Sequence, residues 1–173
     1  MDLLLLWYFI AYSFIGFLLE VAFARIIDHP KKDRKCFFLL PLCPVYGIGA
    51  IFIHWLAGRG GGVLWVMVSG FLGATAAELG MGLFYRYLLG VDFWDYSGQR
   101  FNLDGLVCLR FSLYWTVLAL ALVYWVDPFL IPLLETIPPR LYPPMSIVLT
   151  VDGLLSAAAL RLTRTTDVLR WYK

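Results

Sequence analysis

Residues 3–24 read LLLLWYFIAYSFIGFLLEVAFA, an apolar run in which Glu20 is the one charged residue. A helix that crosses the hydrocarbon core of a bilayer needs roughly 20 mainly apolar residues, and this run is long enough. A secretory signal peptide has a basic start, a shorter apolar core and a small-residue cleavage site, and residues 1–24 show none of these. We therefore expect a retained first membrane helix.

The whole chain shares this apolar character. Of its 173 residues, 61% are hydrophobic, 17% aromatic and 15% charged, and the mean hydropathy is +0.78. Soluble domains have about 45–50% apolar and about 25% charged residues, so a soluble core could not hide this much apolar surface. The predicted fold class is all-α, a polytopic bundle of transmembrane helices that forms a single domain over residues 1–173. No basic run with interleaved aromatic residues occurs, which excludes nucleic acid as a partner.

Five stretches are long and apolar enough to span a membrane. They cover approximately residues 3–24, 40–56, 63–85, 106–125 and 145–162. The second is the least regular, because Pro41 and Pro44 interrupt its start. The proline-rich connection from Asp127 to Pro144 is too short and too interrupted to span, and we expect it to cap the bundle at the interface.

Basic residues gather in alternate connections, which predicts the orientation. One side of the predicted bundle receives Arg25, Lys31, Lys32, Arg34, Lys35, Arg86, Arg100, Arg110, Arg161, Arg164, Arg170 and Lys173. The other side receives only Arg59 and Arg140. The positive-inside rule then gives an outside N-terminus and a cytoplasmic C-terminus in the cell (cytoplasmic) membrane. An odd number of spans is required, and five satisfy it.

Two segments of the chain resemble each other. Residues 13–20 (SFIGFLLE) precede a basic connection and then residues 42–46 (LCPVY). Residues 69–78 (SGFLGATAAE) precede another connection and then residues 107–111 (VCLRF). The pattern indicates a parallel repeat of helical hairpins, formed by spans 1–2 and 3–4, with the fifth span unpaired. The alternative is that membrane helices rich in small residues simply look alike.

Four charged residues within the predicted spans stand out: Glu20, Glu78, Arg110 and Asp152. A charge in hydrocarbon costs several kcal/mol on insertion scales, so each needs a partner or a function. By position, Glu20, Glu78 and Arg110 should lie at similar depth in the cytoplasmic third of the membrane. We interpret them, with Asp152, as substrate- or ion-binding candidates. The structural alternative is an ion pair for the first three and a hydrogen-bonded, neutral side chain for Asp152. For either glutamate alone, extension of the side chain to the nearby interface is a further alternative.

Glu78 has a further property that predicts where it points. It belongs to the row Gly70, Ala74, Glu78 and Gly82, in which residues are spaced by four. Rows of small residues at this spacing form helix–helix interfaces in membranes. We therefore expect the Glu78 carboxylate to face another helix rather than lipid.

The cytoplasmic connection at residues 90–105 reads GVDFWDYSGQRFNLDG and alternates aromatic with acidic and polar residues. Its candidate residues are Trp94, Asp95, Tyr96, Asn102 and Asp104. We interpret it as an interfacial or re-entrant segment that caps the bundle, because irregular backbone near a membrane must pack on protein or line a cavity. A plain aromatic anchor is the alternative.

The usual enzyme motifs are missing from the sequence. It has no nucleophile elbow, no HExxH and no phosphate-binding GxxxxGK[ST]. Cys36, Cys43 and Cys108 lack CxxC spacing, lie on the predicted cytoplasmic side and have no histidine at ligand spacing. We therefore expect no disulfide, no metal site and no cofactor.

Four stretches together carry a family resemblance. They are SFIGFLLE at residues 13–20, LCPVYGIGA at residues 42–50, FWDYS at residues 93–97, and FNLDGLVCLRFSLYW at residues 101–115. As a set, and in this order, they resemble the ABC-transporter type IV permease family of bacterial CmpB-like membrane proteins. Where that family usually has an arginine after the Asn-Leu-x-Gly step, this chain has Leu106, and Arg110 follows four residues later. The departure leaves open whether Arg110 takes that role.

Both the residues and the resemblance lead to the same first hypothesis, a transport or permease component with a polar cluster near the cytoplasmic side. Its expected partners are membrane lipids and either further copies of the chain or a partner membrane or ATPase subunit. A second hypothesis is a membrane-embedded enzyme that acts on a lipid or prenyl substrate at the cytoplasmic interface. A third is a non-catalytic regulatory or assembly subunit whose polar residues only join helices. The absence of enzyme motifs favours the non-enzymatic hypotheses.

Overall fold

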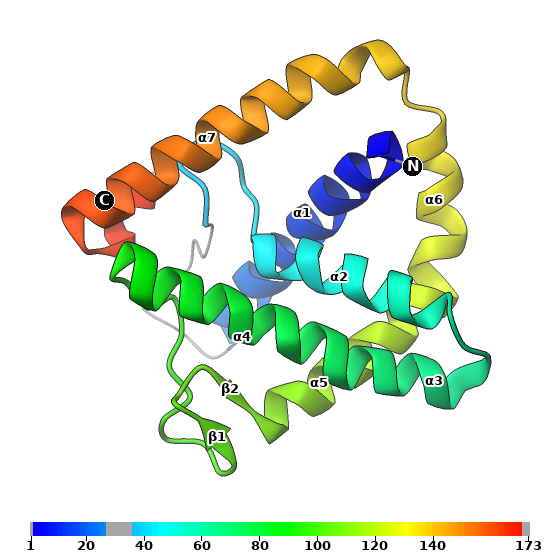
Figure 1. Ribbon diagram of the computed structural model, residues 1–173, viewed down its shortest axis with the longest axis horizontal. Coiled ribbons are helices and arrows are strands. Elements are labelled where there is room, and N and C mark those ends of the chain that lie inside the picture. Colours follow the sequence, from blue (N-terminus) through cyan, green and yellow to red (C-terminus); the bar gives the residue numbers. More distant parts are fainter. Residues whose placement is uncertain (1, 27–35, 171–173) are drawn as a thin grey trace.

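The computed structural model describes residues 2–26 and 36–170 (Figure 1). Most of these residues are helical, which confirms the predicted class. The long helices are α1 (Asp2–Ile26), α2 (Pro44–Ala57), α3 (Gly62–Ser69), α4 (Thr75–Leu83), α5 (Leu109–Ala121), α6 (Asp127–Glu135) and α7 (Tyr142–Thr163). Shorter turns are the π-helical η1 (Gly70–Ala74), η2 (Phe84–Leu89) and η3 (Leu122–Val126), and the 3₁₀ turns η4 (Pro139–Leu141) and η5 (Thr166–Leu169).

The β-structure of the described chain is one small hairpin between α4 and α5. Strands β1 (Asn102–Leu103) and β2 (Val107–Cys108) are antiparallel, and Asn102 pairs with Cys108 while Leu103 pairs with Val107. Its turn uses backbone with positive φ at Asp104 (54°) and Gly105 (70°). The connection at residues 90–105 is therefore a folded segment and not a loose linker.

Several helices of the described chain are long and apolar enough to cross a membrane. Four helical runs meet both criteria, length and apolar composition: Leu3–Ile26, Gly62–Leu89, Leu109–Glu135 and Pro139–Thr163. The apolar α2 is shorter, because its 14 residues extend only about 21 Å at 1.5 Å per residue. Each helix overlaps one of the five predicted stretches, and the chain is a multi-pass membrane protein. The number of spans and their orientation remain predictions.

The start of the second predicted span differs from the structure. Residues 40–43 are not helical, and α2 begins at Pro44. Proline is tolerated in the first turn of a helix because its missing N–H would have no partner there. The two prolines therefore delay the helix rather than break it.

The end of the fourth predicted span also needs correction. The helix does not stop near Trp125 but continues through η3 into α6 and ends at Glu135. With η4 and the start of α7 at Tyr142, most of the predicted interfacial cap is helical. Pro128 has no N–H to donate to the preceding turn of this continuous helix, and Pro132 lies inside α6. Figure 1 shows α6 turned away from the direction of α5. A π-helical turn next to a proline is an ordinary cause of such a kink.

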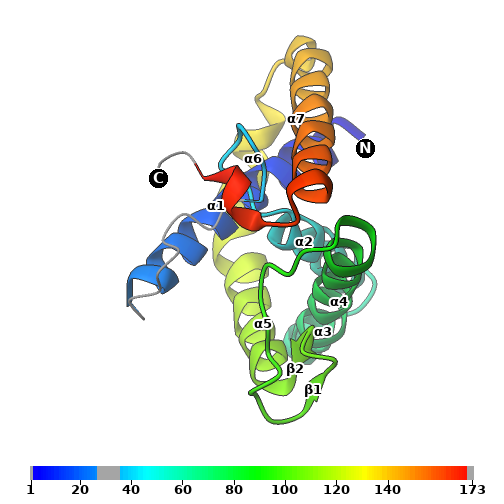
Figure 2. The same cartoon turned by 90° about the vertical axis from the view of Figure 1, so that its left-hand side faces the viewer.

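Neighbouring long helices run in alternating directions. In Figure 1, α1, the α3–α4 run and α7 point toward the side where the C-terminus lies, and α2 and α5 point the opposite way. Figure 2 shows α1 and α2 between α7 on one side and the α4 and α5 pair on the other. The bundle therefore has α2 near its centre and the hairpin of residues 102–108 at one end of the α4–α5 pair.

Glycines allow the central helices to approach closely. A Cβ at Gly47 of α2 would lie 2.6 Å from the backbone oxygen of Phe9 in α1. A Cβ at Gly70 of η1 would lie 2.5 Å from the Cβ of Ala119 in α5. Small residues at helix contacts are the usual means of packing in membranes, where water supplies no driving force between helices.

The outer surface of the bundle is apolar. Leu64, Val117, Leu154 and Leu162 are 74%, 64%, 67% and 84% exposed. They lie on different helices and have many apolar neighbours that are exposed as well. A soluble protein rarely exposes contiguous apolar surface on this scale, whereas lipid accommodates it at no cost.

Candidate functional site

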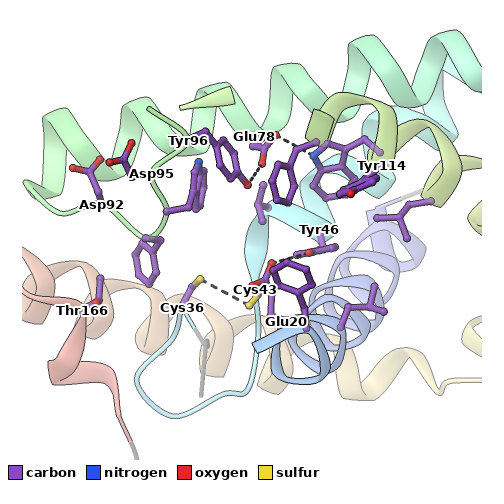
Figure 3. Close-up of a pocket in the computed structure, with 18 of the residues that line it drawn as sticks. Glu20, Cys36, Cys43, Tyr46, Glu78, Asp92, Asp95, Tyr96, Tyr114 and Thr166 are labelled. Carbon is purple, nitrogen blue, oxygen red and sulfur yellow. Dashed lines mark hydrogen bonds between the residues drawn. The ribbon is translucent and has the colours of Figure 1, made fainter. Parts of the chain in front are cut away.

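One cavity of about 790 Å³ lies among α1, α2, α4 and α5 and is bordered by the segment that follows η2 and by the η5 region (Figure 3). Its lining consists of Leu19, Glu20, Phe23, Cys36, Cys43, Val45, Tyr46, Glu78, Asp92, Phe93, Trp94, Asp95, Tyr96, Phe111, Tyr114, Trp115, Leu118, Thr166 and Arg170. This volume lies within the usual range of about 300–1,000 Å³ for small-molecule sites. The lining combines many aromatic rings with several carboxylates.

Glu78 is the most deeply buried carboxylate of the cavity, with 4% of its surface exposed. Its Oε1 accepts a hydrogen bond from the Tyr96 hydroxyl at 2.9 Å, and its Oε2 accepts one from the Trp115 indole Nε1 at 3.1 Å. Both donors are neutral. Among the described residues these two bonds hold the carboxylate at the cavity wall.

The small-residue row of Glu78 packs on protein, as predicted. Ala74 is 0% exposed, and a Cβ at Gly82 would lie 2.9 Å from Cδ2 of Leu106. Because residues spaced by four share a helix face, the same packing directs Glu78 inward. The prediction that Glu78 faces protein rather than lipid is confirmed.

Glu20 enters the cavity from α1, opposite Glu78 (Figure 3). The Tyr46 hydroxyl of α2 donates to its Oε1 at 2.8 Å. One turn before Glu20, Gly16 leaves room for the Tyr46 ring, because a Cβ there would overlap that ring. The rings of Tyr46 and Trp115 are 4.9 Å apart, so aromatic contacts connect the two carboxylate sites. The structure thus brings Glu20 and Glu78 into one cavity.

Arg110 does not join these carboxylates, which corrects the predicted cluster. It is exposed and lies outside the cavity lining, and its Nε donates to the hydroxyl of Tyr114 at 2.9 Å. The reason is helical geometry: Trp115 turns toward Glu78, whereas Arg110 shares a face with Tyr114 at the border of the cavity and donates to it there. Similar depth along the membrane did not imply a common face.

Asp152 also lies away from the cavity. It is 0% exposed in α7, and its Oδ1 and Oδ2 accept the backbone N–H groups of Leu39 at 2.8 Å and Leu40 at 2.7 Å. One turn later, the Ser156 hydroxyl oxygen accepts the N–H of Phe38 at 2.7 Å. These bonds fasten the segment before α2 to α7. The partners of Asp152 are therefore backbone N–H groups. The sequence offered no basic residue as a partner, and a backbone partner leaves no signal in the sequence.

The segment at residues 90–105 divides into two parts. Trp94, Asp95 and Tyr96 line the cavity, and the Trp94 indole donates to the backbone oxygen of Leu106 at 2.8 Å. Asn102 and Asp104 lie outside the lining, where they hold the hairpin together. Asn102 Nδ2 donates to the oxygen of Gln99 at 2.8 Å, and Asp104 pairs with Arg86 at 3.1 Å. The segment packs on the bundle through Trp94 and Tyr96, and its interfacial or re-entrant position remains a prediction.

Two side chains of this segment, Asp95 and Tyr96, have pKa values shifted from their ordinary values. The backbone N–H and then the hydroxyl of Ser97 donate to Asp95 at 2.8 and 3.0 Å and hold the pKa of this carboxyl below its ordinary value. Burial raises the pKa of the Tyr96 hydroxyl, and the charge of Glu78 raises it further. Tyr96 therefore remains a neutral donor to Glu78 at neutral pH.

A second buried polar cluster was not predicted. Asp127, 6% exposed at the start of α6, accepts the hydroxyls of Tyr8 at 2.9 Å and Tyr12 at 2.6 Å. The Nδ1 of His54 lies 3.4 Å from its other oxygen. The one sequence signal for this cluster was the spacing of Tyr8 and Tyr12, which are one helical turn apart. Asp127 is more than 100 residues away in the chain, so the sequence did not connect it to them. This cluster joins α1, α2 and α6.

The cysteines also take positions that their spacing did not reveal. Cys36 and Cys43 both line the cavity, and their sulfur atoms are 4.0 Å apart. Cys43 and Cys108 precede the first residues of α2 and α5, as the similarity of the two segments indicated. In the described part of the chain, none of the three cysteines forms a disulfide.

These features define a multi-pass α-helical membrane protein with an acidic, aromatic cavity among its helices. A family model described as "Putative ABC-transporter type IV" matches residues 7–157, and the chain belongs to this family. The resemblance that the sequence motifs carry is thereby confirmed. No curated protein and no solved structure matches the chain.

Proposed function

We propose that this chain is the membrane-embedded component of a transporter and that the cavity is its substrate site. The observation that carries the proposal is a cavity of about 790 Å³ that reaches the carboxylates of both Glu20 and Glu78 within apolar helices. A carboxylate is costly in hydrocarbon, so such residues in membrane helices usually mark a substrate or ion pathway. The chain belongs to a family described as an ABC-transporter type, and this membership supports the same function.

The orientation that we propose puts this cavity near the cytoplasm. Figure 1 shows α1, the α3–α4 run and α7 ending toward the side where the C-terminus lies, and Arg25, Arg86 and Arg161 belong to the last turns of α1, η2 and α7. Arg170 lines the cavity itself, whereas Arg59 follows α2 and Arg140 belongs to η4 before α7. Five spans with an outside N-terminus satisfy the positive-inside rule. The alternating helix directions in Figure 1 support this topology.

Energy and pathway would come from further chains. The sequence has no phosphate-binding GxxxxGK[ST] motif, so we propose a separate ATPase subunit. The cavity lies at the side of one small bundle, and a second copy or another membrane subunit would complete a pathway.

A second candidate function is an enzyme that acts on a lipid or prenyl substrate. Leu19 and Phe23 of α1 and Tyr114 of α5 border the cavity and are 41%, 40% and 44% exposed, which favours access from the side. An acid–base pair for such chemistry would have to come from Glu20, Glu78 or Asp95. We rank this function second, because each of these carboxylates is held by donors that suit binding more than proton transfer.

The test of a transport site is its access to water. In a variant with Cys36, Cys43 and Cys108 changed to serine, we would introduce Leu118→Cys or Leu113→Cys. Both residues belong to α5, but Leu118 lines the cavity, whereas Leu113 is 52% exposed outside it. A charged, membrane-impermeant maleimide reacts with the thiolate, which forms in water and not in lipid.

We expect inside-out membrane vesicles to show labelling of L118C and little labelling of L113C. Denatured samples of both variants should label fully, which controls for expression. Equal resistance of both native variants to the reagent, in vesicles of either orientation, would falsify the proposal of a hydrated transport site.

A further inference from the structure

Aromatic rings form most of the wall around Glu78. The Tyr96 ring stacks on Phe111 with centroids 4.4 Å apart, and the Tyr46 ring contacts Trp115 at 4.9 Å. All four residues line the cavity, together with Trp94. A cation over the face of such rings is attracted by their quadrupoles, and cages of this type recognise quaternary ammonium groups.

The charge of the lining is also one-sided. Its acidic residues are Glu20, Glu78, Asp92 and Asp95, and Arg170 is the one Lys or Arg of the described lining. Arg170 already pairs with Asp167 at 3.3 Å. Asp92 is paired with Arg86 at 2.8 Å and Asp95 with Ser97, so these two are occupied at the rim.

Glu78 differs from the exposed Asp92 and Asp95 because it is only 4% exposed, and both of its hydrogen bonds come from neutral groups. The Tyr96 hydroxyl and the Trp115 indole hold its oxygens but supply no positive charge. A buried carboxylate arranged in this way favours a cationic ligand over a neutral or anionic one, since a charge is worth more where water is excluded.

We propose that the cavity binds a hydrophobic organic cation, with Glu78 as the counter-charge and the rings of Tyr46, Tyr96 and Trp115 as its cage. This inference rests on the proposed transport function and names the substrate class of the same site. A bulky cation with spread charge fits better than a metal ion, because both Glu78 oxygens already accept hydrogen bonds and the wall around Glu78 is mostly aromatic. The apolar border at Leu19 and Phe23 suits a ligand that also dissolves in lipid.

The test uses two ions of similar shape and opposite charge. Tetraphenylphosphonium and tetraphenylborate would be titrated separately into the purified full chain in detergent, with empty micelles as the blank. We expect saturable binding of tetraphenylphosphonium and no saturable binding of tetraphenylborate. Glu78→Gln should weaken tetraphenylphosphonium binding tenfold or more, and Glu135→Gln, a matched change at an exposed glutamate of α6, should alter it less than twofold.

Similar binding of both ions, or an unchanged affinity in E78Q, would overturn the inference. If E78Q does not fold, the comparison of the two ions on the unchanged protein still decides it. Tetraphenylphosphonium should also protect L118C from the maleimide, because both would occupy the same cavity. If L118C reacts but the cation neither binds nor protects, the substrate class is wrong while the transport site stands. If L118C is inert, the proposed function itself fails.

Discussion

The indole Nε1 of Trp115 lies 3.1 Å from Oε2 of Glu78, so α5 donates directly to the carboxylate that α4 carries into the cavity. The other glutamate has the same kind of partner: Tyr46 of α2 donates to Glu20 of α1 at 2.8 Å. In both cases an aromatic donor on a returning helix holds a glutamate of the preceding one. This parallel supports the predicted duplication of helical hairpins, which remains a prediction.

The close contact of α1 and α2 gives a prediction about glycine. Gly47→Ala should reduce the free energy of unfolding by about 1–3 kcal/mol, because the new Cβ would meet the Phe9 backbone oxygen at 2.6 Å and backbone cannot shift easily. Gly80→Ala is the matched control in α4, where nothing lies within 4 Å of the new Cβ. It should be neutral or stabilise by up to about 1 kcal/mol. Unfolding in SDS would measure both, and equal effects would contradict the contact.

Asp152 gives a prediction that separates structure from binding. Asp152→Ala leaves the part-buried N–H groups of Leu39 and Leu40 without their acceptors and should cost about 1–3 kcal/mol of unfolding free energy. Because Asp152 lies outside the cavity lining, the affinity of the folded variant for tetraphenylphosphonium should stay within about threefold of the original, less than 1 kcal/mol. Thermal unfolding and the ion titration are the measurements. A stable D152A protein that has lost cation binding would return Asp152 to the binding candidates.

The Asp127 cluster gives a third prediction, on the other end of the bundle. Tyr12→Phe removes a hydrogen bond of 2.6 Å to a buried carboxyl and should cost about 1–3 kcal/mol. Tyr8→Phe combined with it should cost more than either change alone, since Asp127 then loses both hydroxyl donors. Tyr124→Phe, at a 45% exposed tyrosine of η3, is the matched control and should change little. The prediction fails if Y12F and Y124F unfold at the same SDS concentration.

The sequence predicted the helices better than it predicted the contacts between their polar side chains. Each helix follows from an apolar run, and the direction of Glu78 follows from residues spaced by four. The long continuation to Glu135 did not follow, because Pro128 is typical of a helix end, whereas in the structure the helix bends there and continues. The pairing of Arg110 was wrong, since depth along a helix says nothing about its face. Asp127 and its tyrosines come together only through packing of distant helices, which no local pattern contains.

Tyr96 gives the last prediction, because its hydroxyl connects the folded segment of residues 90–105 to Glu78 at 2.9 Å. Tyr96→Phe should cost about 1 kcal/mol at neutral pH and should increase proteolysis within that segment. Its effect must also depend on pH, since burial and the Glu78 charge raise the pKa of this hydroxyl above that in the unfolded chain. A raised pKa means that the folded state keeps a proton which the unfolded state loses above about pH 10.

The contribution of the Tyr96 hydroxyl to the free energy of unfolding is therefore constant below about pH 10 and falls above it. Since Y96F lacks the group, the difference in unfolding free energy between the unchanged protein and Y96F should be constant from pH 7 to about pH 9 and narrow as the pH rises past 10. A difference that widened at alkaline pH would show that the hydroxyl is not held protonated by Glu78 and burial.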